Sequence, residues 1–188
     1  MPLRLVAGRH KGRVLAAPPD RATRPTSDRV REAVFNILAH AGYGPDEGDA
    51  VAEAVVLDAF AGSGALAFEA LSRGAAEAWL FDSSAAALGF ARRNAEALNE
   101  AARAHVLRAD ALKPPPARAH ATLLFLDPPY RQGLVGPAIK ALSAAGWLAP
   151  GCLVVAETAA DEPAVPGLDL LDERRYGIAR ISFGRVAG

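Results

Sequence analysis

The chain contains one segment with the pattern of a strand, a glycine-rich turn and a helix in immediate succession. Residues 54–60 are an apolar run typical of a buried strand, and the Ala-Gly-Ser-Gly turn of residues 61–64 follows directly. Residues 65–73 have the pattern of a helix. The next apolar run, residues 78–81, leads into Asp82. This order predicts a βαβ unit with two parallel strands and places the chain among the α/β folds.

The glycine turn and Asp82 indicate a nucleoside site. Asp82 lies twenty residues after Gly62, where a βαβ unit carries the carboxylate that binds ribose hydroxyls. Residues 62–67 also match the loose dinucleotide pattern G-x-G-x-x-A, so a nicotinamide-dependent dehydrogenase is an alternative. Asp58, at the end of the first strand, would repel a pyrophosphate, unless it only caps the following loop. S-adenosylmethionine carries an ammonium group and a sulfonium but no phosphate, and we expect it to be the cofactor.

The segment Asp127-Pro128-Pro129-Tyr130 follows a second buried run, residues 121–126. Two consecutive prolines fix the backbone and remove two N–H donors. The Asp127 carboxylate, the Pro128 carbonyl and the Tyr130 ring then offer hydrogen-bond acceptors and a stacking face. An ordinary strand-ending turn is the alternative, because Asp and Pro are common in turns. We predict that the segment holds a flat amine such as the exocyclic amino group of a base.

Three segments of the chain carry motifs that occur together. They are residues 24–32 (RPTSDRVRE), residues 56–66 (VLDAFAGSGAL) and residues 125–130 (FLDPPY). With them the chain resembles the bacterial ribosomal RNA small subunit methyltransferase D family over essentially its whole length. The resemblance departs from the family pattern at Asp82, where a glutamate is expected, and in the proline-rich segment after Asp110.

The resemblance implies a Rossmann-like, class I S-adenosylmethionine-dependent methyltransferase, an α/β fold with a mostly parallel seven-stranded sheet and an antiparallel last strand. It implies transfer of the methyl group to the exocyclic N2 of a guanine in 16S rRNA, guanine 966, with S-adenosylhomocysteine as the product. It further implies that the substrate is the assembled small ribosomal subunit and that the enzyme is a monomer.

The expected cofactor site lies at the carboxyl ends of the strands, where open α/β sheets bind ligands. Asp58 should hold the methionine ammonium group, Asp82 the ribose, and Asp110 with Ala111 the adenine amino edge. The glycines of the turn allow close approach of the backbone. The full set of expected cofactor-binding residues is Asp58, Phe60, Ala61, Gly62, Ser63, Gly64, Asp82, Ser83, Asp110 and Ala111.

The acceptor base is selected by its hydrogen-bonding edge. Guanine presents N1–H and N2–H₂, a donor pair that the Asp127 carboxylate accepts, whereas adenine presents a donor and an acceptor that suit an amide better. We expect a flipped guanine to stack on Tyr130 and N2 to attack the sulfonium methyl in line. The expected catalytic residues are Asp127, Pro128, Pro129 and Tyr130. Two alternatives stay open: an adenine-N6 nucleic-acid methyltransferase that uses the same loop, and a non-catalytic RNA-binding assembly factor.

Basic residues are concentrated near the N-terminus, although the whole chain has a formal net charge of +0. Residues 1–31 hold eight Arg and Lys and two acids, hence a net of +6, and residues 174–188 hold four Arg and no acid. Such a basic face attracts phosphate, and a merely solvated basic hairpin is the alternative. The expected RNA-binding residues are Arg4, Arg9, Lys11, Arg13, Arg24, Arg29 and Arg31.

The remaining patterns complete a single α/β unit. Two short strands around residues 8–12 predict a basic β-hairpin of residues 1–20, appended to a methyltransferase domain of residues 21–188. Further helices are expected near residues 85–99 and 134–145, and further strands near residues 104–109, 151–157 and 174–177. The last two strands must be antiparallel, because a four-residue connection is too short for a parallel crossover.

A helix is also expected to begin at Thr26 or Ser27, either of which can cap it. Arg29 and Arg31 are expected to lie off its apolar stripe, which consists of Val30, Val34, Ile37, Leu38 and Ala41.

A length of 188 residues, of which 51% are hydrophobic, suits one domain with a substantial core. The one cysteine, Cys152, lies in an apolar run and excludes an internal disulfide and a cysteine metal cluster. The histidines lack metal-ligand spacing, so we expect no metal. No apolar stretch approaches the roughly 18 residues that span a membrane, and no signal-peptide pattern is present. We therefore expect a cytoplasmic protein with no membrane contact.

Overall fold

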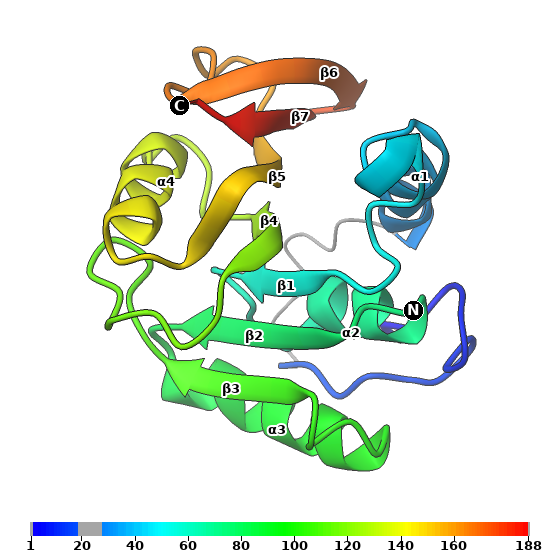
Figure 1. Ribbon diagram of the computed structural model, residues 1–188. Coiled ribbons are helices and arrows are strands. Elements are labelled where there is room, and N and C mark those ends of the chain that lie inside the picture. The colour runs from blue at the N-terminus through cyan, green and yellow to red at the C-terminus, as the bar shows by residue number, and fades with distance from the viewer. Residues whose placement is uncertain (1, 19–27, 188) are drawn as a thin grey trace.

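The computed structural model describes residues 2–18 and 28–187, and these fold around one seven-stranded sheet (Figure 1). The strand order is β3-β2-β1-β4-β5-β7-β6. The strands are β1 (Val55–Asp58), β2 (Glu77–Asp82), β3 (Ala104–Arg108), β4 (Ala121–Leu126), β5 (Leu148–Ala159), β6 (Leu168–Tyr176) and β7 (Ala179–Val186). The strands predicted for the sheet are all present, and β5 extends beyond its predicted bounds at both ends.

The sheet is parallel from β3 to β5 and antiparallel at its other edge. β1 pairs in parallel with β2 and β4, β2 pairs with β3, and β4 pairs with β5. β7 pairs antiparallel with both β5 and β6. Only Gly177 and Ile178 separate β6 from β7, and Gly177 has a φ of 61°, as a tight turn requires. The predicted fold class, mostly parallel with an antiparallel last strand, is confirmed.

Helices cover both faces of the sheet. They are α1 (Asp28–His40), α2 (Ala65–Ser72), α3 (Ala85–Ala97) and α4 (Val135–Ala144), and a short 3₁₀ helix, η2 (Pro45–Glu47), follows α1. Figure 1 shows α1 and α4 on opposite sides of the sheet. Leu123 and Phe125 pack in one core with α1, α2 and α3, whereas the alternate residues Leu124 and Leu126 pack in a second core with α4. The strand period of two thus builds a three-layer α/β/α structure.

The buried stripe of α1 differs from the predicted one. Phe35 is fully buried, and its ring centroid lies 5.5 Å from that of Phe125. Arg31, expected to lie off the apolar stripe, is only 1% exposed, while Ile37 is partly exposed. The prediction for Arg31 was wrong because a buried acid on α2, described below, provides its partner. The predicted cap, Thr26 or Ser27, lies outside the described residues.

Residues 2–18, here called the N-terminal arm, form a looser structure than the predicted pair of strands. Arg4 and Val14 make a single antiparallel bridge, and the Leu5 N–H donates to the Arg13 carbonyl at 3.0 Å. The arm lies against α2, because the Arg9 N–H donates to the Ser72 carbonyl at 2.8 Å. A Cβ at Gly8 would lie 1.9 Å from that carbonyl oxygen, so glycine is required for the contact. The division into a hairpin appendage and a domain stays a prediction.

Candidate functional site

The glycine loop, residues 61–64, connects β1 to α2 and is tightly constrained. The Ala61 N–H donates to the Phe81 carbonyl at 2.8 Å, and the Gly64 N–H donates to the Ala61 carbonyl at 2.7 Å. Gly64 has a φ of 87°, and a Cβ there would lie 2.5 Å from the Phe68 ring and 2.7 Å from Leu80. Glycine is therefore required at this position for both backbone conformation and packing, and the loop presents a fixed backbone at the end of β1.

Asp82, the last residue of β2, holds this loop in place. Its Oδ2 accepts the Gly62 N–H at 2.8 Å, and its Oδ1 accepts the Ser84 N–H at 2.8 Å. Each carboxylate oxygen has two lone pairs, so Asp82 can organise the backbone and still accept the hydroxyl donors of a ribose. Ser83, between the two anchored segments, is exposed.

Asp58 and Ser63 lie deeper in the same site. Asp58 ends β1 and is 1% exposed, and Ser63 is fully buried. Phe60 is half-buried beside them in the chain. The Ser63 carbonyl accepts a hydrogen bond from the Asn94 side-chain amide at 3.0 Å, so α3 also supports the glycine loop. Sequence reasoning missed Asn94, because an isolated asparagine in a helix carries no motif.

Asp110 and Ala111 lie just beyond β3. Asp110 is exposed, and its Oδ1 accepts the Leu112 N–H at 2.8 Å, whereas Ala111 is 2% exposed. Because β3, β2, β1 and β4 are adjacent and parallel, the four acids at or just after their carboxyl ends share one edge of the sheet. These acids are Asp58, Asp82, Asp110 and Asp127.

The DPPY loop, residues 127–130, begins directly after β4. Asp127 is half-buried, Pro128 is buried and Pro129 is exposed. The Tyr130 hydroxyl donates to Glu157 Oε1 at 2.5 Å, which fixes the tip of the ring against β5. The loop thus extends across the carboxyl edge from β4 toward its neighbour β5.

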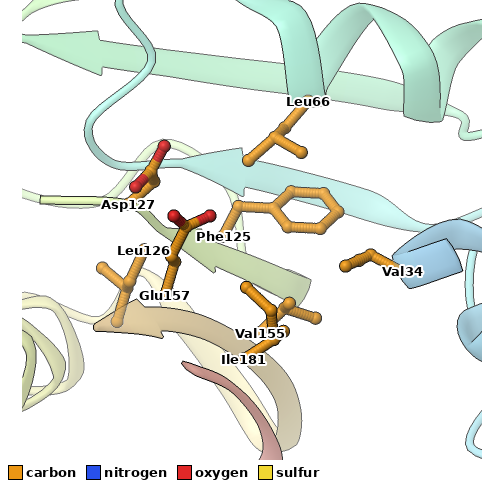
Figure 2. Close-up of a pocket in the computed structure, with 8 residues that line it drawn as sticks. All are labelled: Val34, Leu66, Phe125, Leu126, Asp127, Val155, Glu157 and Ile181. Atoms are coloured by element: carbon orange, nitrogen blue, oxygen red, sulfur yellow. The ribbon is translucent and has the colours of Figure 1, made fainter. Parts of the chain in front are cut away.

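A small pocket, partly open to solvent, lies beside this loop (Figure 2). Figure 2 shows the carboxylates of Asp127 and Glu157 at the same end, with apolar side chains forming the remainder. The lining residues are Val34, Leu66, Phe125, Leu126, Asp127, Val155, Glu157 and Ile181. When Asp127 and Glu157 are ionised, none of these described residues has a side-chain hydrogen-bond donor. The pocket therefore offers apolar surface and hydrogen-bond acceptors.

Sequence reasoning missed Glu157, although a signal was present. Glu157 follows the apolar run of β5 just as Asp127 follows that of β4. In the sheet Leu126 pairs with Ala156, so the two acids are the next residues along adjacent parallel strands. A search for acids at the ends of apolar runs would have found both.

Three expected RNA-binding residues donate to backbone carbonyls, Arg4 within the arm and Arg9 and Arg13 to the body of the protein. Arg4 Nη1 donates to the Gly12 carbonyl at 3.1 Å, Arg9 Nη2 donates to the Leu71 carbonyl at 3.0 Å, and Arg13 Nη2 donates to the Ala97 carbonyl at 2.6 Å. All three arginines are nevertheless exposed in part. Lys11 and Arg29 are exposed as well, and Arg24 lies outside the described residues.

Arg31 was predicted to bind RNA, but its side chain is buried. Its Nε lies 3.6 Å from Glu69 Oε2, one of its Nη atoms donates to the Arg4 carbonyl, and that atom also lies 2.9 Å from Asp28 Oδ1. A guanidinium that is 1% exposed and held by these groups has no surface to offer to RNA. Arg31 is therefore a structural residue.

Glu69 on α2 is the partner that sequence reasoning missed. It is fully buried, and its two oxygens accept the Val6 and Ala7 N–H groups of the arm at 2.9 and 3.0 Å. It also accepts from Arg73 Nε at 2.8 Å. A buried acid with these donors ties the arm to the helix that follows the glycine loop.

Three further features of residues 2–18 and 28–187 bear on function: the grouping of possible metal ligands, the cysteine and the length of the helices. Within this part of the chain no three His, Cys, Asp or Glu are grouped so that they could hold a metal ion. Cys152 is 1% exposed, and burial raises the pKa of its thiol to about 12, so it is not a nucleophile. None of the described helices is long and apolar enough to cross a membrane.

Comparisons with known proteins agree with the geometry. Residues 3–185 match the family described as conserved hypothetical protein 95. The chain is 38% identical over 168 residues to ribosomal RNA small subunit methyltransferase D of Escherichia coli (strain K12), with 87% of this chain and 79% of the relative covered.

Solved structures are similar as well. The protein yhhF from Escherichia coli is 33% identical, with a TM-score of 0.81 that covers 100% of this chain and 99% of that one. An RNA methyltransferase from Salinibacter ruber, solved with S-adenosyl-L-homocysteine, is 17% identical, with a TM-score of 0.60 over 87% of this chain and 94% of that one. It supports the fold of the class I methyltransferases. The chain thus belongs to the conserved hypothetical protein 95 family, which includes the ribosomal RNA small subunit methyltransferases D.

Proposed function

We propose that this protein transfers a methyl group from S-adenosylmethionine to the exocyclic N2 of a guanine in 16S rRNA. The observation that carries the proposal is the pocket that ends in Asp127 and Glu157, which offers acceptors and apolar surface. The Escherichia coli relative is, by its name, a methyltransferase of small-subunit ribosomal RNA. The family resemblance identifies the target as guanine 966.

The residues at the carboxyl edge suit the cofactor. Gly64 keeps the loop compact, and the Asp82 carboxylate retains lone pairs for ribose hydroxyls beyond those used by Gly62 and Ser84. Asp58 supplies a buried negative charge for an ammonium group, and Asp110 with Ala111 supplies the surface for adenine. When bound, S-adenosylmethionine supplies an electrophilic methyl group on its sulfonium.

The pocket favours guanine over adenine. Guanine offers N1–H and N2–H₂ as a donor pair, and carboxylates accept both donors. Adenine would turn its N1 acceptor toward the same carboxylates and lose a hydrogen bond there. Because the pocket lining has no side-chain donor among its described residues, adenine has no compensating partner.

The chain's own residues contribute mainly by positioning. Asp127 and the Pro128 carbonyl accept the hydrogens of the target amine, and the Tyr130 ring provides a stacking surface for a base flipped out of its helix. Holding the two reactants in one geometry removes most of the entropic part of the barrier. The role of Asp127 is to orient the target amine. The amine loses its proton only after it has accepted the methyl group.

The substrate is proposed to be the 16S rRNA in an assembled small subunit, and the enzyme a monomer in the cytoplasm. The exposed Lys11 and Arg29, with the partly exposed arginines of the arm, supply positive charge for phosphate contacts. Because Arg31 is buried, the basic surface is smaller than its sequence count suggests.

The test is methyl transfer from labelled S-adenosylmethionine to small ribosomal subunits that lack the modification, followed by mass spectrometry of the nucleosides. N2-methylguanosine supports the proposal, and mapping then locates the nucleotide. N6-methyladenosine would instead identify an adenine-N6 methyltransferase. Absence of any product on competent subunits would favour a non-catalytic RNA-binding assembly factor.

A further inference from the structure

Glu157 is the one acid of the pocket that no sequence motif marks, and its surroundings give it a distinct task. Its side chain is buried, with the residue only 8% exposed, and it lines the pocket together with Asp127 (Figure 2). Burial of an acid is costly unless it is hydrogen-bonded, so its partners carry information about its role.

The Tyr130 hydroxyl is such a partner. It donates to Glu157 Oε1 at 2.5 Å, within the range of short hydrogen bonds to ionised acceptors. Glu157 lies on β5, where it pairs with Ile181 of β7 and directly follows Ala156, the last β5 residue that pairs with β4. Tyr130 sits on a loop, so the strand residue fixes the loop residue rather than the reverse.

Arg131, the next residue of the chain, makes further bonds beside this loop. The Arg131 N–H donates to Glu162 Oε1 at 3.0 Å, and Arg131 Nη2 donates to Asp161 Oδ2 at 3.1 Å. These bonds anchor the backbone and side chain of the following residue. The prolines fix the backbone before Tyr130, and the hydroxyl bond to Glu157 restrains its side-chain torsions.

We propose that Glu157 is a positioning residue, which holds the Tyr130 ring in the orientation that a flipped base needs for stacking. The inference rests on the proposed function, because it assumes a base beside Tyr130. Glu157 does not touch the base in this role. It acts through the tyrosine, and any group at position 157 that accepts the hydroxyl hydrogen bond should preserve that action.

A double-mutant cycle tests the inference on the full-length enzyme with unmethylated small ribosomal subunits. The variants are Tyr130→Phe, Glu157→Ala and the double variant, with Glu157→Gln as the conservative replacement. Asp161→Asn is the matched control, because Asp161 is an exposed acid that contacts the same loop through Arg131. For each variant kcat, KM for the subunits and Kd for S-adenosylmethionine are measured.

Each single variant, Tyr130→Phe and Glu157→Ala, should lower kcat by about 10-fold, the value of one hydrogen bond to a charged group. The double variant should be no worse than either single variant, because both remove the same bond. Glu157→Gln should retain activity within about 3-fold, since its amide oxygen still accepts the hydroxyl. The Kd for S-adenosylmethionine should be the same in all.

Two results would overturn the inference. If the losses of the single variants multiply to about 100-fold in the double variant, Glu157 acts independently of Tyr130. If Glu157→Gln is as impaired as Glu157→Ala, the charge itself is required. The wild-type product separates this from the proposed function: a base other than guanine rejects the proposed function, while the cycle still decides whether Glu157 acts through Tyr130.

Discussion

The N-terminal arm and the carboxyl edge of the sheet use polar side chains in opposite ways. In the arm, backbone groups are paired with buried side chains of the helices: Glu69 accepts two arm N–H groups, and Asn94 both donates to and accepts from Ala16. At the carboxyl edge Asp127 lines a pocket that is open to solvent, and Asp110 is exposed. Polar groups of the arm bind α2 and α3, whereas acids at the carboxyl edge keep oxygen acceptors at the surface.

The burial of Arg31 shows why a count of basic residues near the N-terminus overstates the basic surface. A run of arginines indicates phosphate binding only if the guanidinium groups face solvent. Here Arg31 is buried against Glu69, and Arg9 and Arg13 donate to carbonyls of α2 and α3 residues. Charge counting cannot separate an arginine that faces RNA from one that caps a carbonyl.

The largest expected effect belongs to the carboxyl edge. Asp127→Ala should lower methyl transfer by about 10³-fold or more, because it removes the acceptor that orients the amine. Single-turnover kinetics on small subunits would measure the loss. Stability should change by less than about 1 kcal/mol, since the residue is only half-buried. A large drop in stability would indicate a structural role for Asp127. Retained methyl transfer would show that Asp127 does not orient the amine.

The next effect belongs to the arm. Glu69→Ala should lower the free energy of unfolding by about 3–5 kcal/mol, because it removes the buried acid beside Arg31 and leaves two arm N–H groups without acceptors. Urea denaturation measures the change. Glu96→Ala, at an exposed position on α3, is the control and should stay within about 0.5 kcal/mol. Equal effects of the two substitutions would contradict a structural role for Glu69.

Asn94 connects the two regions, since its amide donates to the Ala16 carbonyl at 2.9 Å and to the Ser63 carbonyl at 3.0 Å. Asn94→Asp removes both donors while keeping the acceptor for the Ala16 N–H. We expect a loss of about 1–3 kcal/mol in stability and about 10-fold weaker S-adenosylmethionine binding, measured by denaturation and calorimetry.

Asn99→Asp is the matched control for that substitution, because Asn99 is exposed and its φ of 57° suits aspartate equally well. If Asn94→Asp destabilises the protein but leaves cofactor affinity unchanged, the arm and the glycine loop are independent, and the proposed link between the two regions is wrong.

A smaller effect depends on pH. Burial opposes ionisation of Glu100, but hydrogen bonds from His10 and Arg103 outweigh it, and the pKa of Glu100 lies below its ordinary value. The stabilisation from this acid is therefore complete above its unfolded pKa, about 4.3, and is lost as the pH falls through the lower folded pKa. The difference in Tm between wild type and Glu100→Gln should shrink as the pH is lowered from 7 to 3. A difference that is constant with pH would reject this role.

The smallest effect concerns RNA. Lys11 is exposed at the turn of the arm, and Lys11→Ala should weaken RNA binding a few-fold and reduce the slope of log K against log salt by about 0.7–0.9. Lys140→Ala is the control, because Lys140 is exposed on α4, which covers the opposite face of the sheet. Identical salt slopes for the two variants would show that the arm does not contact RNA.

Much of the site was predictable because it is encoded locally. Gly62 and Gly64 follow an apolar run and precede a helix, and the same short segment forms the loop in the structure. Asp127 to Tyr130 follow β4 at the predicted residue, since consecutive prolines end a strand whatever surrounds it. The antiparallel last pair likewise followed from the length of its connection.

The remainder depended on contacts between residues far apart in the chain. Glu157 meets Tyr130 only because β5 pairs with β4 in one register, and Arg31 is buried only because α1 packs beside Glu69 of α2. Sequence by itself determined where the backbone must turn and which runs must be buried, because steric and hydrophobic constraints act over a few residues. Tertiary structure alone decided which charges are neutralised within the protein and which face a ligand, because a charge's role depends on the groups packed around it.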